Sequence, residues 1–348
     1  MKHQTTRYGE IPFYKIGTFG NTADAFISKK LFLEYKTKYS FPKKGDILIS
    51  ASGTIGRAVI YDGKPAYFQD SNIVWIDNDE TLVKNDFLFY AYSNVKWNTE
   101  HTTILRLYND NFRNTLIPLP PLNEQSAIAN ILSGLDRYLC ALDALILKKE
   151  GVKKALSFEL LSQRKRLKGF NQAWQRVRLG DICEITTGSL DANEMVYYGK
   201  YRFYTCAKEY YFIDKYAFDT EAILISGNGA YVGYVHYYKG KFNAYQRTYV
   251  LDNFSEHIIF VKYFLTMFLQ SHIQTNKNEG NTPYIVMGTL KDFEILLPPL
   301  NEQIAIANIL SGLDHEITSL KNKKRQFDNI KKALNHDLMS AKIRVLKK

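Results

Sequence analysis

One segment of the sequence occurs twice, and this repeat constrains the fold more than any other feature. Residues 120–136, PPLNEQSAIANILSGLD, return as residues 298–314 with the single change of Ser126 to Ile304. The two copies begin 178 residues apart. Because only two copies occur and the period has the size of a domain, a duplication that produces a pseudo-two-fold molecule explains the repeat better than a solenoid does.

Shorter matches extend the repeat towards the N-terminus. The segment ILIS stands at 47–50 and again at 223–226. A tyrosine–glycine pair at 8–9 with phenylalanine–tyrosine at 13–14 returns at 198–199 and 203–204, so the first copy carries about 14 extra residues before ILIS. Each half therefore has the same order, which is a strand-rich region followed by a long helix.

The repeated segment opens an amphipathic helix in each half. Asn123 and Asn301 follow two prolines and a leucine, and both are good N-cap residues with a glutamate in the next turn, where the helix dipole favours acid. Behind them, apolar residues alternate steps of four and three, which predicts a coiled-coil seam. Since a single helix with an apolar stripe must bury that stripe against a partner, we expect the two helices to pack together. The predicted seam consists of Ile128, Leu132, Leu135, Leu139 and Leu142 in the first helix and Ile306, Leu310, Leu313, Ile317 and Leu320 in the second.

Short β-forming runs separated by glycine and aspartate turns fill the remaining regions, together with helical patterns at 83–92 and 256–271. We therefore predict an α+β fold, with two α/β domains in a pseudo-two-fold arrangement, separated by two long antiparallel coiled-coil helices. The predicted boundaries are 1–119 for the first domain, 120–168 for the central helix, 174–297 for the second domain and 298–348 for the C-terminal helix.

The composition is that of a folded, basic protein. The 348 residues are 45% hydrophobic and 14% aromatic, which argues against disorder. The formal net charge is +11, but most of the excess lies in the helical segments, where lysine-rich faces are usually just solvated. Three widely spaced cysteines argue against disulfides or a zinc site and favour the cytoplasm. No apolar run has the length of a membrane span, so we expect no membrane association.

Motifs for catalysis are missing from the sequence. It contains no phosphate-binding loop, no dinucleotide fingerprint, no HExxH helix and no GxSxG elbow. It also lacks the Asn-Pro-Pro-aromatic or Asp-Pro-Pro-Tyr tetrapeptide expected of an adenine methyltransferase. We therefore predict no catalytic residue, no metal and no cofactor, and a single-chain nuclease or methyltransferase is disfavoured.

Three pairs of segments carry side chains that could contact DNA, although they equally suit hairpin turns and sheet ends. Asn and Gln can bond adenine bidentately, Arg can do so to guanine, and Tyr can stack or bond phosphate. The hydroxyl-rich turn at 50–57 and its counterpart at 226–233 supply Ser52, Thr54, Arg57, Asn228 and Tyr231. The stretches 67–72 and 245–249 supply Gln69, Asn72, Tyr245, Gln246 and Arg247. The segments before the last strand of each region supply Arg106, Asn109, Arg113, Asn281, Thr282 and Tyr284.

These features together resemble the specificity subunits of Type I restriction-modification systems. Their target recognition domains typically end in a hydrophobic strand, a Pro-Leu-Pro-Pro-type turn and a Glu-Gln pair, as in IPLPPLNEQ at 117–125 and LLPPLNEQ at 296–303. The segment WQRVRLGDI at 174–182, followed by Thr187 and Gly188, resembles the opening of such a domain. The resemblance covers nearly the whole chain.

The resemblance implies a non-catalytic subunit that reads double-stranded DNA. Each recognition domain would read one half of a split target, and the two helices would pack antiparallel and set the spacer. Two methyltransferase subunits and ATP-dependent translocase-nuclease subunits would dock on the chain, and S-adenosylmethionine, ATP and magnesium would belong to those partners. A structural coiled-coil scaffold with heads that bind sugars or proteins stays open as the alternative.

The first half departs from the family pattern in one respect. Because Tyr8 aligns with Tyr198, the first half contains no counterpart of residues 174–190. We therefore expect that the first domain could miss an edge strand.

Overall fold

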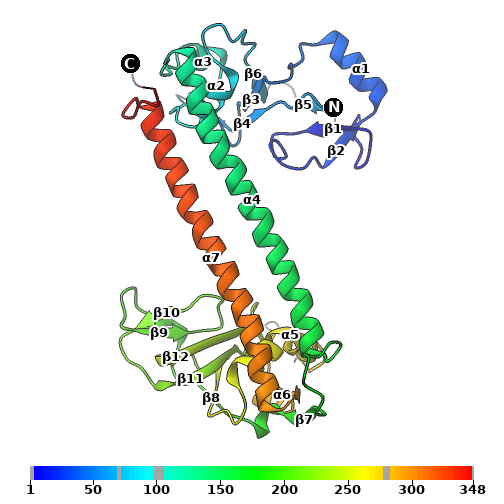
Figure 1. The fold of residues 1–348 in the computed structure, drawn as a ribbon, viewed down its shortest axis with the longest axis vertical. Coiled ribbons are helices and arrows are strands. Elements are labelled where there is room, and N and C mark those ends of the chain that lie inside the picture. Colours follow the sequence, from blue (N-terminus) through cyan, green and yellow to red (C-terminus); the bar gives the residue numbers. More distant parts are fainter. Residues whose placement is uncertain (1–3, 69–71, 98–105, 277–282, 347–348) are drawn as a thin grey trace. The chain divides into compact units, whose positions relative to one another are not determined.

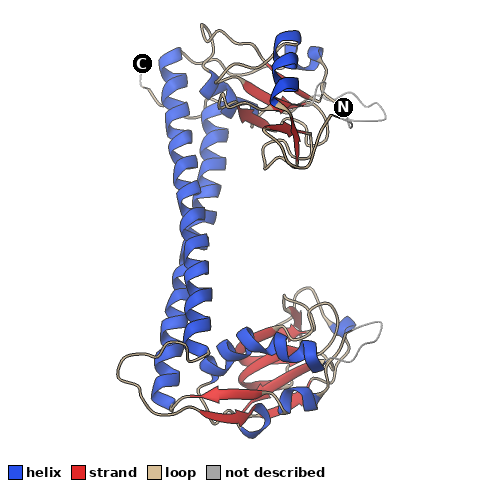
Figure 2. Cartoon of the chain, turned by 90° about the vertical axis from the view of Figure 1, so that its right-hand side faces the viewer, coloured by secondary structure: helices blue, strands red, loops and turns tan. Residues whose placement is uncertain are grey.

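The computed structural model describes residues 4–68, 72–97, 106–276 and 283–346 (Figure 1). The chain divides into two compact units. Unit 1 comprises Met1–Asp143 and Asn322–Lys348, and unit 2 comprises Ala144–Lys321. Each unit contains one α/β region and one half of each of the two long helices (Figure 2). The predicted α+β class with long helices is confirmed. The division between the units falls within both long helices, and the domain boundaries given above stay a prediction.

The α/β region of unit 1 contains two small sheets, with strand orders β2-β1-β5 and β4-β3-β6. In the first sheet β1 pairs antiparallel with β2 and parallel with β5, whereas the second sheet is antiparallel. The elements are β1 (Ile11–Tyr14), β2 (Ala25–Ile27), α1 (Lys29–Lys38), β3 (Ile47–Ser50), β4 (Ala58–Ile60), β5 (Tyr67–Phe68), β6 (Ile73–Trp75), α2 (Asn85–Tyr92) and α3 (Asn109–Arg113).

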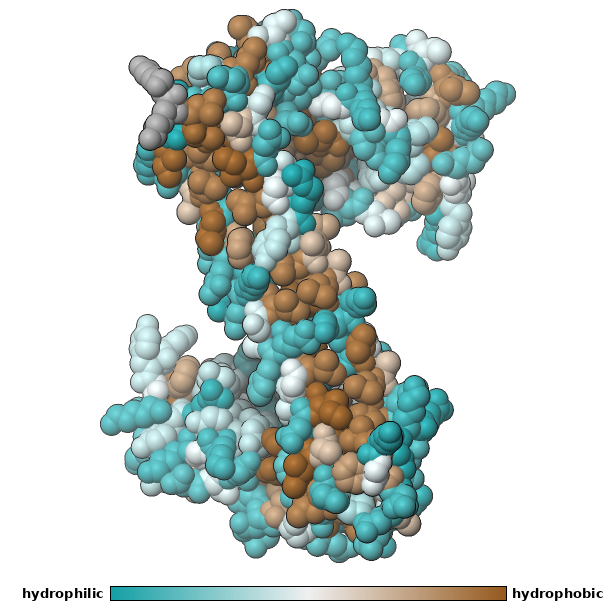
Figure 3. Space-filling model, in the orientation of Figure 1, coloured by the Kyte–Doolittle hydropathy of each residue, from teal (hydrophilic) through white to brown (hydrophobic). Residues whose placement is uncertain are grey.

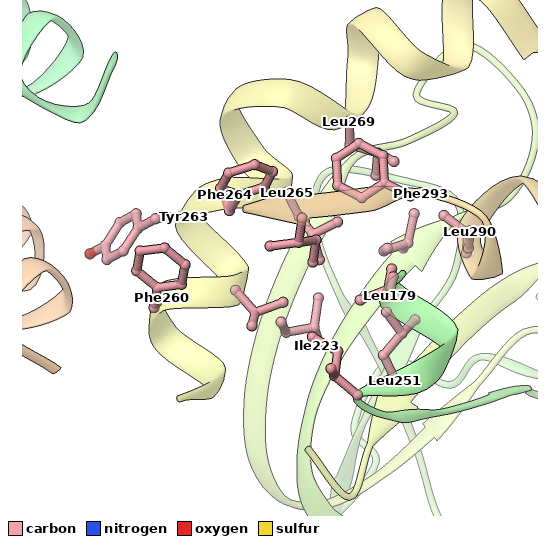
Figure 4. Packing of buried hydrophobic residues seen from close by; sticks show 14 of the residues in the cluster. Leu179, Ile223, Leu251, Phe260, Tyr263, Phe264, Leu265, Leu269, Leu290 and Phe293 are labelled. Carbon is pink, nitrogen blue, oxygen red and sulfur yellow. The ribbon is translucent and has the colours of Figure 1, made fainter. Parts of the chain in front are cut away.

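The α/β region of unit 2 contains one larger sheet, in the order β10-β9-β12-β11-β13-β8, and the pair β14-β7. Helix α5 packs on the larger sheet over an apolar core (Figure 4). The elements are β7 (Gln175–Arg178), η1 (Leu179–Asp181), β8 (Glu184–Thr187), η2 (Ala192–Glu194), β9 (Tyr201–Tyr204), β10 (Tyr211–Ile213), β11 (Phe218–Ser226), β12 (Val235–Ala244), β13 (Thr248–Asp252), α5 (Ile258–Asn276), α6 (Met287–Lys291) and β14 (Glu294–Leu297).

Both α/β regions follow one plan. In each, an antiparallel strand pair (β1 with β2, β9 with β10) joins a parallel neighbour, and a buried central strand (β3, β11) lies between two antiparallel neighbours. The long strand β12 of unit 2 corresponds to both β4 and β5 of unit 1. Between β4 and β5, Gly63 has a positive φ of 85° and Pro65 has no N–H to donate. This interruption explains why unit 1 has two sheets where unit 2 has one.

The two long helices, α4 (Leu122–Leu161) and α7 (Leu300–Met339), pair antiparallel within each unit. In unit 1, Lys331 binds Asp136 and Arg344 binds Glu124; in unit 2, Lys153 binds Asp314 and Arg166 binds Glu302. Early residues of one helix thus face late residues of the other. All four pairs are related by the 178-residue repeat, so the duplication extends to the contacts between the helices.

Apolar residues of the helix seam also form part of the hydrophobic core of each α/β region. Ile128 and Leu132 pack with Phe87 of α2, and Ile306 and Leu310 belong to the core under α5. Of the predicted seam, Leu135, Leu313 and Leu320 are half-buried and the other members are buried: Ile128, Leu132, Leu139, Leu142, Ile306, Leu310 and Ile317. Within the described parts of the chain, no helix is both long enough and apolar enough to cross a lipid bilayer.

Candidate nucleic-acid interface

In unit 2 the three predicted segments meet at one backbone junction. The N–H of Gly227 donates to the carbonyl of Arg247 at 2.8 Å, and the carbonyl of Gly227 accepts from Ile285 N–H at 2.9 Å. Asn228 forms an isolated bridge with Tyr284. The structure therefore brings the turn after β11, the turn before β13 and the segment before α6 to the same place.

In unit 2 the backbone around residue 227 leaves no room for a side chain. A Cβ atom on Gly227 would lie 2.3 Å from the carbonyl oxygen of Arg247 and 2.8 Å from the ring of Tyr249. A side chain at this position would push the two turns apart. The same reasoning applies to Gly188, where a Cβ atom would lie 1.9 Å from the carbonyl oxygen of Ala244.

Unit 1 forms the same junction with different side chains. The N–H of Ala51 donates to the carbonyl of Asn72 at 2.8 Å, and the carbonyl of Ala51 accepts from Leu107 N–H at 2.8 Å. Ser52 bridges Arg106, and the Ser52 hydroxyl donates to Asn72 Oδ1 at 2.9 Å. Ala51 thus occupies the place of Gly227, and Asn72 the place of Arg247.

The remaining predicted residues of unit 1 differ in their availability. The guanidinium of Arg57 donates from Nη1 to the carbonyl of Phe19 at 2.8 Å, so it holds a neighbouring loop. Thr54 and Asn109 are exposed, and Arg113 is exposed beside Asp110, at 3.5 Å. The predicted residues Gln69, Asn281 and Thr282 lie outside the described residues.

The predicted residues of unit 2 are mostly on the surface. Arg247 is exposed, and its guanidinium makes no ion pair or hydrogen bond with the residues that the structure describes. Gln246 donates from Nε2 to Asp191 Oδ1 at 2.8 Å, and Tyr245 is half-buried. The side chains of Tyr231 and Tyr284 are 44% and 37% exposed, so both rings can be reached from solvent.

A cationic and aromatic cluster beside this junction was not predicted from the sequence. The Nζ atom of Lys208 lies 5.1 Å from the centre of the Tyr231 ring. Arg202 lies over the rings of Tyr210 and Tyr238, at 4.2 and 4.5 Å. The high density of tyrosines among residues 196–216, interleaved with Lys and Arg, was the available signal for this cluster.

Two hydrogen bonds hold the cluster's loop, residues 205–210, one to the junction and one to β12. The Cys206 thiol donates to the carbonyl of Arg247 at 3.3 Å. His236 Nε2 lies 2.9 Å from the carbonyl of Ala207. Burial lowers the pKa of His236 below its usual value, so the ring is neutral at pH 7 and contributes a hydrogen bond but no charge.

The site offers binding chemistry. Exposed guanidinium and ammonium groups suit phosphates, and amide and tyrosine groups suit base edges and ring faces. Within the described residues, no group of three or more His, Cys, Asp or Glu side chains could hold a metal ion. The fold defines a chain with two related α/β regions, each built on its own portion of a helix pair.

Comparison with known proteins identifies the family. The family described as the Type I restriction modification DNA specificity domain matches residues 1–149 and 171–327. These two matches cover most of the chain, so this chain belongs to that family. The resemblance noted in the sequence is thereby confirmed.

Individual relatives support the assignment over different lengths. A putative type I restriction enzyme specificity subunit of Haemophilus influenzae is 65% identical over 133 residues, which are 38% of this chain and 34% of that protein. The EcoDI specificity subunit of Escherichia coli is 38% identical over 170 residues, 48% of this chain and 37% of that protein. The chain thus spans only about a third of the length of these two relatives. The MjaVIII specificity subunit of Methanocaldococcus jannaschii is 25% identical, covering 92% of this chain and 84% of that protein.

Solved structures agree on the fold. The crystal structure of a Type I restriction-modification S subunit from M. genitalium superposes with a TM-score of 0.67 at 18% identity, covering 97% of this chain and 91% of that one. A chain from a structure of type I R-M complex assembly gives a TM-score of 0.55 at 16% identity, covering 94% and 91%. At these identities the likeness concerns the fold.

Proposed function

We propose that this chain is the DNA specificity subunit of a Type I restriction-modification complex. Each unit reads one half of a bipartite target in double-stranded DNA. The chain itself is non-catalytic, and partner methyltransferase and translocase-nuclease subunits carry out adenine methylation and restriction. The partners, not this chain, hold S-adenosylmethionine, ATP and magnesium.

The observation that carries this proposal is the repeated junction with diverged side chains. A DNA reader needs several hydrogen-bonding side chains on one rigid backbone, because sequence is distinguished by donors and acceptors at base edges. Both units supply such a backbone through equivalent hydrogen bonds at Ala51 and Gly227. The equivalent positions hold Asn72 in unit 1 and Arg247 in unit 2, which favour adenine and guanine respectively. Two diverged copies therefore suit a target with two different halves.

The surface of the helix pair suits the docking of protein partners. Large apolar side chains remain exposed along both helices, and Figure 3 shows hydrophobic residues gathered there. Exposed apolar surface of this kind usually marks a protein contact. The exposed residues include Ile131, Leu145, Leu147 and Val152 on α4 and Ile304 and Ile309 on α7. A scaffold whose heads bind sugars or proteins is disfavoured, because the family model concerns a DNA specificity domain.

Methylome sequencing tests the proposal directly. The cognate methyltransferase is expressed in a host with and without this chain, and methylated adenines are mapped. We expect one bipartite motif to appear only when the chain is present. A methylome that is identical with and without the chain would contradict the proposal.

The spacer role of the helices has its own test. One heptad is inserted into α4 between Glu124 and Arg166, and a matched heptad is inserted into α7 between Glu302 and Arg344. We expect the gap between the two half-sites to change while the half-sites themselves are retained. An unchanged gap in an active complex would rule out a spacer role.

A further inference from the structure

The 178-residue repeat continues without a gap through both long helices. KKAL at 153–156 of α4 returns at 331–334 of α7, in step with the repeated segment at the start of each helix. Each residue of α4 therefore has a counterpart in α7 that is numbered 178 higher. This equivalence shows what two α4 helices, or two α7 helices, from separate copies of the chain would place in contact in the same antiparallel register.

Contacts towards the ends of the helices are the same in both units. They are the pairs Glu124–Arg344 and Asp136–Lys331 in unit 1 and the pairs Glu302–Arg166 and Asp314–Lys153 in unit 2. A second α4 in place of α7 would keep both contacts, because Arg166 and Lys153 are the counterparts of Arg344 and Lys331. These contacts therefore stabilise any pair of the helices and do not select the partner.

Contacts between the middle parts of the helices differ between the units. In unit 1 the rings of Tyr138 and Phe327 lie 4.7 Å apart. Their counterparts in unit 2, Glu316 and Lys149, form an ion pair at 2.8 Å. The two copies have therefore diverged here into an aromatic contact in one unit and a charged contact in the other.

The charges next to this position have diverged as well. In unit 1 Lys324 binds Asp143 at 2.7 Å, and in unit 2 Lys321 binds Glu150 at 2.6 Å. Both pairs join an acid on α4 to a lysine on α7. Because Lys321 is the counterpart of Asp143, the two helices carry opposite charges at this repeated position. The side chains of Lys149 and Lys324 are 31% and 34% exposed, so solvent screens these charges only in part.

Two α4 helices in the same register would lose these attractions. The counterpart of Lys321 in a second α4 is Asp143, so each Glu150 would face an acid in place of a lysine. Each Tyr138 would face Lys149 in place of an aromatic ring. Every such contact would occur twice, because a pair of identical helices has a two-fold axis. Charges that face each other between paired helices set the choice of partner, so the α4–α4 pair is disfavoured.

Two α7 helices would also be mismatched. Each Lys324 would face Lys321, and each Glu316 would face Phe327 and lose its ion pair. Lys321 would still face an acid, because Asp328 takes the place of the acid on α4. The combination of one α4 with one α7 is therefore the one in which all the middle contacts are matched.

The choice of partner matters because α4 is synthesised first. The whole of unit 2 between Leu161 at the end of α4 and Leu300 at the start of α7 must be translated before α7 exists. This takes on the order of 10 s at the usual rate of synthesis. During that time the nearest helices with a matching apolar seam are the α4 helices of other nascent chains. A second α4 is thus the competing partner.

We propose that the diverged middle contacts make α4 pair with α7 and disfavour its pairing with a second α4. The partner that this surface fits is α7, and the partner that it excludes is the same helix of a second copy of the chain. The repeated contacts towards the helix ends stabilise the pair, and the diverged contacts select its members. The inference concerns helix pairing alone and does not rest on the proposed function. Its consequence is that one molecule carries two different α/β regions.

Two charge substitutions in the full chain test the proposal. Glu150→Lys with Lys324→Glu places like charges in both α4–α7 pairs and opposite charges in the α4–α4 and α7–α7 pairs. We expect light scattering after size-exclusion chromatography to give twice the molar mass of the wild type, which we expect to be a monomer. Unlabelled and ¹⁵N-labelled variant chains are then refolded together and treated with a carbodiimide. Mixed-isotope cross-links should join Asp143 to the lysine introduced at position 150.

The matched control reverses all four charges. Asp143→Lys, Glu150→Lys, Lys321→Glu and Lys324→Glu together contain the two test substitutions but restore opposite charges between α4 and α7. We expect this chain to be a monomer like the wild type. A monomeric two-substitution variant, or a control that dimerises to the same extent as that variant, would overturn the proposal.

A second measurement decides the case in which the two-substitution variant does not fold. One chain carries Asp143→Lys with Glu150→Lys, and a second chain with a different tag carries Lys321→Glu with Lys324→Glu. Each alone places like charges between α4 and α7, whereas together they are matched if the chains exchange their α7 helices. We expect capture of one tag to retain the other chain at least tenfold more than with two co-expressed wild-type chains. Equal retention would contradict the proposal.

Discussion

Arg166 donates two hydrogen bonds to Glu302, from Nε at 3.2 Å and from Nη2 at 2.5 Å, where the end of α4 meets the start of α7. The Glu302 side chain is completely buried, and that of Arg166 is 26% exposed. In unit 1, Arg344 makes the same bidentate contact with Glu124, at 2.7 and 2.5 Å. In each unit the glutamate of the repeated Glu-Gln pair, at the start of one long helix, thus binds the arginine that follows the end of the other.

We expect Arg166→Ala to lower the free energy of unfolding of unit 2 by about 3 kcal/mol, because it leaves a buried carboxylate without its counter-charge. Urea denaturation followed by tryptophan fluorescence, to which Trp174 beside Glu302 contributes, measures the effect. Lys168→Ala is the control, since Lys168 is exposed, and its effect should stay within about 0.5 kcal/mol. An Arg166→Ala chain as stable as the control would show that the pair contributes little.

The stability of unit 2 should depend on pH through Asp314. Burial alone would raise the pKa of Asp314, but hydrogen bonds from Lys153 and Tyr263 and the charge of Lys153 outweigh it, so the pKa lies below its usual value. The unfolded pKa is about 3.9, so the contribution is complete above that pH and is lost as the pH falls through the lower native pKa. Denaturation midpoints from pH 7 down to pH 2 should therefore fall less steeply for Asp314→Asn. Parallel curves for the two proteins would refute this assignment.

Replacement of Gly227 by alanine should break the junction of unit 2. The new Cβ atom would lie 2.3 Å from a backbone carbonyl oxygen, and we expect a loss of about 2 kcal/mol in unfolding free energy. Gly312→Ala is the matched control: nothing lies within 4 Å of its Cβ position in α7, so helix propensity should stabilise it by up to about 1 kcal/mol. Thermal denaturation distinguishes the two variants. If Gly312→Ala were destabilised and Gly227→Ala were as stable as the wild type, the steric role of Gly227 would be contradicted.

Arg247→Ala should weaken cognate DNA binding by the assembled methyltransferase complex. Loss of one base-reading arginine costs about 1–3 kcal/mol, which is roughly a fivefold to 150-fold loss of affinity. Arg176→Ala is the control, because Arg176 lies on β7 and binds Glu294. Equal methylation by wild type and Arg247→Ala would remove Arg247 from the interface.

Arg57→Ala should behave differently from Arg247→Ala. Because Arg57 Nη1 holds the carbonyl of Phe19, its removal should lower the stability of unit 1 as well as DNA affinity. Thermal denaturation and DNA binding are measured on the same preparation. A stable Arg57→Ala chain with lost DNA binding would assign Arg57 directly to the DNA.

Local patterns explain which elements could be predicted. The helical pattern at 83–92 became α2 and the pattern at 256–271 became α5, because periodicity and flanking turns act over a few residues. The sequence placed these segments at similar positions in each repeat, but it did not predict that Gly227 hydrogen-bonds to both Arg247 and Ile285. Nor could the sequence show that Arg57 would hold Phe19, which stands 38 residues away.

The sequence by itself determined the duplication, the two long helices, the α+β class and the family, because these depend on repeated sequence segments and short-range periodicity. Tertiary structure decided which side chains share a surface, that Asn72 and Arg247 are equivalent, and which charged residues of α4 and α7 bind each other. These features arise from hydrogen bonds between residues far apart in the chain. The path of the backbone, which spacing alone does not reveal, brings those residues together.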